Sequence, residues 1–133
     1  MKFEVMRGDF LEALQKIQYS ASGKGLMPIL SGVKIDALEE ELVLSATDLE
    51  SYSISSCVAN VEEKGSCVVN LKTILDYLRD SSDEKMSLQQ DGNELVIEGS
   101  KSKIRLYTMP VEDFPAQPSL DVMVAEGIKT ERF

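Results

Sequence analysis

The chain has 133 residues, 43% of them hydrophobic, and a formal net charge of −9, so it can bury one core and is not expected to coat nucleic acid by bulk attraction. Cys57 and Cys67 stand apart from any CxxC motif and the chain has no histidine, which gives no support to a zinc site or a disulfide framework. No apolar run approaches the roughly 20 residues that span a bilayer, and Glu4 and Asp9 lie where a signal peptide would be apolar, so we expect a soluble, cytoplasmic protein.

The first half of the chain predicts one strand, one helix and three further strands. Alternation indicates a strand over residues 2–6, and Asp9 is the expected N-cap of a helix that ends near Ser20. The small, Gly-rich segment SASGKGLMP at 20–28 predicts a loop. The three strands that follow are expected over residues 29–36, 41–47 and 51–61.

The same order begins again at Gly65. Residues 66–70 predict a strand, and Asn70 is the expected cap of a helix whose core face carries Leu71, Ile74, Leu75 and Leu78. Strands are then expected over residues 86–90, 94–99 and 103–109, with Asp91-Gly92-Asn93 as a hairpin turn.

This duplication predicts an α+β fold in which a β-α-β-β-β unit occurs twice about an internal pseudo-twofold axis, with two helices side by side on antiparallel sheets. Residues 1–117 are expected to form this domain. Residues 118–133 are expected to be a linker and the truncated start of a second domain, with a simple C-terminal extension as the alternative.

Three acid-free windows, at residues 13–35, 64–75 and 99–111, hold eight of the 14 basic residues. They predict a local anion-facing surface, and the alternative is that they are buried stretches. On the second helix, Lys72 and Arg79 lie close to one polar stripe with Asp76 between them, where Asp76 can pair with Lys72.

Four sequence pieces carry a resemblance to a known family. They are MKFEV at 1–5 with a helix behind it, PIL at 28–30, TDLE at 47–50 and MPVEDFP at 109–115. In order and spacing they closely resemble the first domain of the bacterial sliding clamp, the beta subunit of DNA polymerase III, over about residues 1–115.

The resemblance implies the DNA-clamp fold and the function of a DNA polymerase processivity factor. Members of this family are not enzymes and use no cofactor or metal. The implied assembly is a head-to-tail ring of two subunits, each with three similar domains. The helices of these domains face duplex DNA, which is bound independently of its sequence. A clamp loader and DNA polymerase III are the other implied partners, in the bacterial cytoplasm.

The resemblance also implies which residues contact DNA. Lys24, in the Gly-rich loop, and Lys72 stand at the family's basic positions, and Arg79 and Arg7 are assigned to the same inner face. The alternative for Lys24 is a solvated lysine, and for Lys72 a helix pair with Asp76. Lys16 is expected to pair with Glu12 and to be structural.

The strand at 103–109 is implied to be an edge strand that joins the neighbouring subunit. Alternation places Ile104 and Leu106 on one face and Lys103, Arg105 and Tyr107 on the other. The implied subunit-interface residues are Tyr77, Lys101, Lys103, Ile104 and Leu106. The alternative is that Ile104 and Leu106 are core residues and that the lysines protect the edge.

Two other functions compete with a DNA clamp. One is a stand-alone interaction module that binds protein through the strand at 103–109. The other, more weakly supported, is an acid-based or metal-dependent hydrolase built on Asp48 and Glu50. Without histidine or a further ligand cluster, these two acids are better explained by a turn.

Overall fold

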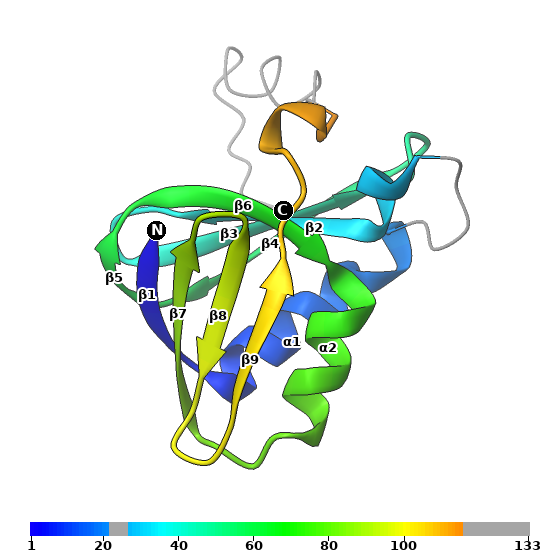
Figure 1. The fold of residues 1–133 in the computed structure, drawn as a ribbon. Helices are drawn as coiled ribbons and strands as arrows, with labels where there is room; N and C mark the ends of the chain where they lie inside the picture. Colours follow the sequence, from blue (N-terminus) through cyan, green and yellow to red (C-terminus); the bar gives the residue numbers. More distant parts are fainter. Residues whose placement is uncertain (22–26, 116–133) are drawn as a thin grey trace.

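The computed structural model describes residues 1–21 and 27–115, which form two helices and two antiparallel sheets (Figure 1). In chain order, the elements are β1 (Lys2–Met6), α1 (Arg7–Ile17), η1 (Gln18–Ser20), η2 (Pro28–Ser31), β2 (Gly32–Ala37), β3 (Glu41–Thr47), β4 (Tyr52–Val58), β5 (Asn60–Glu63), β6 (Gly65–Asn70), α2 (Leu71–Asp80), β7 (Lys85–Asp91), β8 (Glu94–Glu98), β9 (Lys103–Tyr107) and η3 (Val111–Asp113), where η marks a 3-10 turn. The predicted α+β class is confirmed.

The two sheets share strands from both halves of the chain. One has the order β5-β1-β7-β8-β9 and the other β4-β3-β2-β6. Strand β1 of the first unit therefore pairs with β7 of the second, and β6 of the second pairs with β2 of the first, all antiparallel. Each three-strand meander thus takes its fourth strand from the other unit, which is the arrangement that an internal pseudo-twofold requires.

The first helix begins earlier than predicted. Helix α1 starts at Arg7, directly after β1, and its N-cap residue Met6 makes no side-chain cap. Asp9 instead lies in the first turn, where its charge is favourable to the helix dipole. In α2 the predicted cap is confirmed, because the Thr73 amide donates to Asn70 Oδ1 at 2.9 Å.

Three predicted strands have other bounds in the structure. Residues 29–31 belong to η2, because Pro28 starts a 3-10 turn, and β2 begins only at Gly32. The single strand predicted over 51–61 is two strands, β4 and β5, which join different sheets at the buried Ala59. The last strand ends at Tyr107, and Met109 forms an isolated bridge with Val68.

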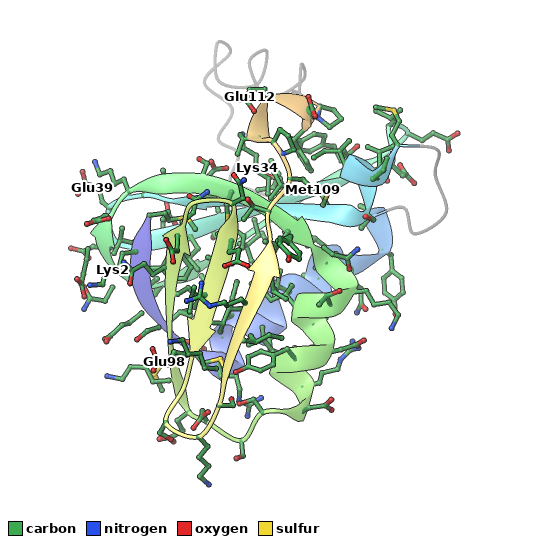
Figure 2. All side chains as sticks on the ribbon, viewed as in Figure 1. Lys2, Lys34, Glu39, Glu98, Met109 and Glu112 are labelled. Atoms are coloured by element: carbon green, nitrogen blue, oxygen red, sulfur yellow. The ribbon has the colours of Figure 1, made fainter. Side chains whose placement is uncertain are left out.

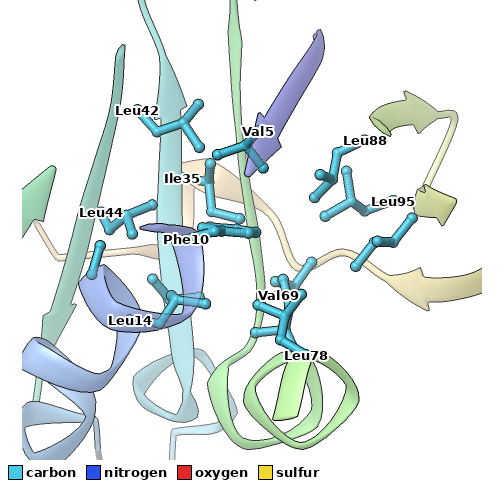
Figure 3. Close-up of a cluster of buried hydrophobic side chains, with 14 of the residues drawn as sticks. Val5, Phe10, Leu14, Ile35, Leu42, Leu44, Val69, Leu78, Leu88 and Leu95 are labelled. Atoms are coloured by element: carbon cyan, nitrogen blue, oxygen red, sulfur yellow. The ribbon is translucent and has the colours of Figure 1, made fainter. Parts of the chain in front are cut away.

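The main core lies between the two sheets and the two helices. Figure 3 shows Phe10 and Leu14 of α1 among side chains from both sheets, and Leu78 of α2 beside Val69. The helices place their apolar faces on this core, and α1 and α2 lie side by side (Figure 1). Their polar faces therefore remain on one side of the domain, as predicted.

A second, smaller core fixes the segment that follows β9. Ile29, Leu30, Val68 and Phe114 are buried together, and the rings of Tyr52 and Phe114 meet edge to face with centroids 6.3 Å apart. This packing anchors the MPVEDFP segment at 109–115 to the rest of the domain.

Candidate nucleic-acid and subunit interfaces

The exposed face of α2 carries two cations around one carboxylate. Lys72 Nζ lies 3.0 Å from Asp76 Oδ2, and Arg79 Nη1 lies 3.7 Å from Asp76 Oδ1. Arg79 also donates to Gln18 Oε1 at 3.4 Å, which connects α2 to the end of α1. Because α2 buries its apolar face, Lys72 and Arg79 necessarily point to solvent. The predicted pairing of Lys72 with Asp76 is confirmed.

An open groove of about 440 Å³ runs between the end of α1 and α2. Polar and charged side chains from both segments surround a small apolar floor. The lining residues are Gln18, Ala21, Ser31, Asn70, Leu71, Lys72, Leu75, Asp76 and Arg79. No pattern in the sequence singles out Gln18, because its position beside Arg79 depends on how the helices pack.

The ion pairs of Asp76 with Lys72 and Arg79 are too weak to prevent an anionic ligand from binding these two cations. The Lys72 side chain is 84% exposed, and pairs of this kind contribute about 0–1 kcal/mol to stability. A phosphate can therefore replace Asp76 as the partner of either cation at little cost. Lys72 and Arg79 are balanced by Asp76 and Asp80, so α2 as a whole is neutral in an otherwise acidic chain.

Lys16 does not form the ion pair expected for it. Lys16 is exposed on α1, and no carboxylate in residues 1–21 or 27–115 lies within ion-pair distance of it. The predicted pair with Glu12 is therefore wrong, and Lys16 is an available cation. Lys24 lies outside the described residues.

Arg7 makes specific contacts with the end of α2. Its Nε donates to the Asp83 carbonyl oxygen at 2.7 Å, and its Nη1 donates to the Leu78 carbonyl oxygen at 2.9 Å. These bonds satisfy carbonyl groups at and after the last turn of the helix, which lack intrahelical partners. The structure thus shows a structural role for Arg7, and the DNA contact that the resemblance implied for it stays a prediction.

The acid-free windows do not gather on one surface. Lys34 on β2 lies 4.0 Å from Asp36, and Lys64 lies 2.7 Å from Glu39. Figure 2 shows Glu39 and Lys2 projecting on the side of the domain away from α2. Of the exposed window lysines, Lys16 and Lys72 lie on the two helices, whereas Lys101 and Lys103 lie at and just before β9, so the windows do not form one anion-facing surface.

Strand β9 is an edge strand of the five-stranded sheet and presents cations on its outer face. Lys101 and Lys103 are exposed, and Tyr107 is 81% exposed, whereas Arg105 pairs with Glu94 at 2.8 Å and with Asp91 at 3.4 Å. On the inner face, Leu106 is only 8% exposed and Ile104 is half-buried against the core. Leu106 is therefore a core residue of this domain, which was the alternative to an interface role.

The turn before β9 is fastened to the end of α2. The Tyr77 hydroxyl lies 2.6 Å from Ser102 Oγ, which places Tyr77 near β9 as predicted. Asp83 is buried beside the same turn, where its Oδ1 accepts from Ser100 Oγ at 2.6 Å and from the Ser100 amide at 3.2 Å. A Cβ atom at Gly99 would overlap the Asp83 carboxylate, which would then have to leave its present position.

The Asp83 carboxylate makes stability depend on pH. Hydrogen bonds from the Ser100 hydroxyl, followed by backbone amides and the charge of Lys101, hold the pKa of Asp83 below its usual value. Because the pKa is lower in the folded state than in the unfolded state, the ionised carboxylate stabilises the fold at pH values above the ordinary Asp pKa of about 3.9. This contribution is lost as the pH falls through the folded-state pKa.

We therefore expect Asp83→Asn to lower the urea midpoint at pH 7, and the difference from the parent chain to shrink below about pH 4. Urea titrations from pH 2.5 to pH 7 measure this. Asp80→Asn is the matched control, because Asp80 is exposed on the last turn of α2. A pH-independent difference for Asp83→Asn would contradict the assignment.

Neither thiol is suited to chemistry at neutral pH. Burial, with the nearby carboxylates of Asp9 and Glu41, raises the pKa of Cys57 to about 11, and burial raises the pKa of Cys67 to about 12. Both therefore remain protonated and weakly nucleophilic.

The acidic pair at 48 and 50 forms a turn, as predicted. Asp48 Oδ1 accepts from the amides of Glu50 and Ser51 at 3.0 and 2.8 Å, with Leu49 between them in a left-handed conformation. Within the described ranges, no cluster of three acidic or cysteine side chains is placed to hold a metal ion, and no helix is long and apolar enough to cross a membrane.

Comparisons with known proteins match this chain to one family over nearly the whole of the described domain. The family described as "DNA polymerase III beta subunit, N-terminal domain" matches residues 1–118. The beta sliding clamp of Caulobacter vibrioides is 30% identical over 122 residues, which are 90% of this chain and 33% of that protein. The beta sliding clamp of Vibrio cholerae is 31% identical over 117 residues, which are 86% of this chain and 32% of that protein.

Solved structures give the same result. Caulobacter crescentus pol III beta superposes with a TM-score of 0.84 at 30% identity, over 88% of this chain and 32% of that chain. The DNA polymerase III subunit beta of Pseudomonas aeruginosa superposes with a TM-score of 0.84 at 25% identity, over the same shares. The chain thus spans about a third of the length of these relatives. From sequence and fold together, the chain belongs to the family of DNA polymerase III beta subunit N-terminal domains.

Proposed function

We propose that this chain is the first domain of a ring-shaped sliding clamp that encircles duplex DNA and tethers the replicative DNA polymerase. The observation that carries the proposal is the exposed α2 face, where Lys72 and Arg79 project on the helix side of a domain whose other surfaces are sheets. The domain acts without catalysis and in the bacterial cytoplasm, where the chromosome lies. Its further partners are a second clamp subunit, a clamp loader and DNA polymerase III.

The chemistry of this face suits a sliding contact. Lysine presents a compact, hydrated charge on a flexible stem, and it exchanges phosphate for water more readily than a fixed bidentate contact does. Contacts to phosphate position a protein on DNA without reading its sequence. We assign the DNA contacts to Lys72, Arg79 and Lys24, and we add Lys16 because it is exposed on the adjacent helix. Arg7 supports this face by fixing the end of α2.

Net negative charge is compatible with this role. A closed ring is retained on DNA by topology, so the individual contacts can remain weak. The acidic groups elsewhere on the chain then reduce nonspecific adhesion to nucleic acid. The subunit contact is assigned to the β9 edge, with Lys101, Lys103 and Ile104 at the surface, Tyr77 beside it and Leu106 supporting it from the core.

The DNA assignment is tested by the salt dependence of binding. We expect the chain to bind duplex DNA weakly and without sequence preference. Each phosphate contact that is removed should lower the slope of log K against log salt by about 0.9. Lys72→Ala with Arg79→Ala should therefore reduce the slope by up to about 2, measured by fluorescence anisotropy with labelled duplexes of two sequences.

Lys64→Ala is the matched control, because Lys64 is exposed but pairs with Glu39 away from the helix layer. It should leave the slope nearly unchanged. If the double variant binds like the parent chain, or if Lys64→Ala has the same effect, the helix face is not the DNA contact. Absence of any DNA binding by the parent chain would favour the protein-interaction module.

A further inference from the structure

Tyr19 projects into solvent from a turn whose backbone is held in place. It follows Gln18 in η1, directly after α1, and its side chain is 89% exposed, the largest value among the large hydrophobic side chains of the described residues. The Ala21 amide donates to the Gln18 carbonyl oxygen at 3.4 Å, and the buried Ser20 hydroxyl is hydrogen-bonded to the Ser53 hydroxyl of β4. The Tyr19 ring is therefore carried on a fixed support without being part of the core.

The residue before Tyr19 belongs to the wall of the groove between the end of α1 and α2. Gln18 lines this groove, whose volume is about 440 Å³. Its floor is apolar, because Leu71 and Leu75 are only 2% and 3% exposed. Pockets of roughly 300–1,000 Å³ with an apolar floor and a few polar groups are typical sites for small organic ligands. The groove can therefore hold a group of the size of a single nucleotide.

Two cations stand beside this groove. Lys72 and Arg79 line it, and each is paired with the exposed carboxylate of Asp76, which a phosphate can replace. Arg79 also donates to Gln18 Oε1 at 3.4 Å, so its guanidinium lies next to the residue that precedes Tyr19. A phosphate and a base of one DNA strand can therefore contact Arg79 and Tyr19 together.

This combination suits an unpaired nucleotide better than an intact duplex. Proteins that hold single strands combine cations along the backbone with exposed aromatic rings on which bases stack. Bases in an intact duplex are stacked on their neighbours, so an aromatic side chain can stack only on a base that is unpaired or displaced. Every base has a flat face, and such stacking is therefore tolerant of sequence.

We propose that the groove between α1 and α2 binds an unpaired nucleotide, whose base stacks on Tyr19 while its phosphate contacts Lys72 or Arg79. The domain thereby distinguishes a junction between single-stranded and double-stranded DNA from a continuous duplex. The proposal rests on the proposed function, because it uses the same two cations. It adds a contact to a base, which sliding on duplex DNA does not require.

The test compares two partial duplexes that differ only in the bases of a short single-stranded overhang. One overhang carries normal bases, and the other carries abasic residues, so both present the same phosphates. We expect the chain to bind the normal overhang about fivefold or more tightly, measured by fluorescence anisotropy. Tyr19→Ala should remove this difference, whereas Tyr19→Phe should keep it, because the ring remains. Tyr19 is exposed, so both variants keep the fold.

Tyr107→Ala is the matched control, since Tyr107 is 81% exposed on β9, at an edge of the five-stranded sheet. It should leave the preference for the normal overhang unchanged. Equal binding of the two overhangs by the parent chain would overturn the proposal, and so would equal effects of Tyr19→Ala and Tyr107→Ala.

A blunt duplex separates this proposal from the proposed function. Tyr19→Ala should bind the blunt duplex with the affinity and salt slope of the parent chain, because an intact duplex offers no free base. If Lys72→Ala with Arg79→Ala leaves duplex binding intact while Tyr19→Ala removes the base preference, the duplex assignment fails and the stacking contact stands. If the salt slope falls as expected but the parent chain binds both overhangs equally, the stacking contact fails and the duplex assignment stands.

Discussion

Replacing Phe10 by alanine is expected to lower the free energy of unfolding by about 3–5 kcal/mol. Phe10 is fully buried on the inner face of α1, and its ring meets that of Phe3 edge to face, with centroids 6.4 Å apart. Figure 3 shows it between side chains of both sheets, so truncation would leave a cavity and remove packing contacts between α1 and both sheets. Domains of this size are stable by about 5–15 kcal/mol, and the variant would therefore lose much of that margin.

Urea denaturation followed by circular dichroism measures the effect. Tyr19→Ala is the matched aromatic control, because Tyr19 lies just after α1 and is 89% exposed. Its substitution should change stability by no more than about 0.5 kcal/mol. If the Phe10 and Tyr19 variants are equally stable, α1 does not anchor the core in the way described.

Replacing Arg7 by alanine should destabilise the domain by about 1.5–3 kcal/mol and leave DNA contact almost unchanged. The guanidinium donates hydrogen bonds to the Leu78 and Asp83 carbonyl oxygens, and its removal leaves these partly buried groups without a protein donor. Amide hydrogen exchange should therefore become faster in the last turn of α2. Urea denaturation gives the stability, and the salt slope gives the DNA contact.

Arg79→Ala is expected to have the opposite effects on stability and on DNA contact. The Arg79 side chain is 43% exposed, and among the described residues its polar contacts are surface contacts with Asp76 and Gln18, so its loss should change the salt slope and hardly affect stability. Should Arg7→Ala reduce the salt slope while the domain keeps its stability, Arg7 belongs to the DNA contact, as the resemblance implied.

The features predicted from sequence are those set by local periodicity. Asn70 and the apolar spacing from Leu71 to Leu78 define α2 and its exposed face, and these signals lie within one short segment. The relation between the halves was also predictable, because the same order of elements occurs twice. Lys72 and Arg79 follow directly from these signals, since they lie opposite the apolar face.

The features that were missed depend on contacts between distant segments. The role of Arg7 is set by a loop 76 residues away, and no local pattern records that contact. The alternation over residues 51–61 continues through Ala59, although the chain changes sheets there. Similarly, the spacing of Glu12 and Lys16 permits an ion pair on any helix, but side chains on an exposed surface need not form it.

The exchange of strands between the two halves has a consequence for how the domain folds. Residues 2–6 find their place beside residues 85–89, and residues 65–70 beside residues 32–37, so neither half completes a sheet by itself. Strands from both halves must therefore pair with each other before the core is closed. Pairing over such long separations slows folding and makes the domain one cooperative unit, although its sequence pattern is that of two.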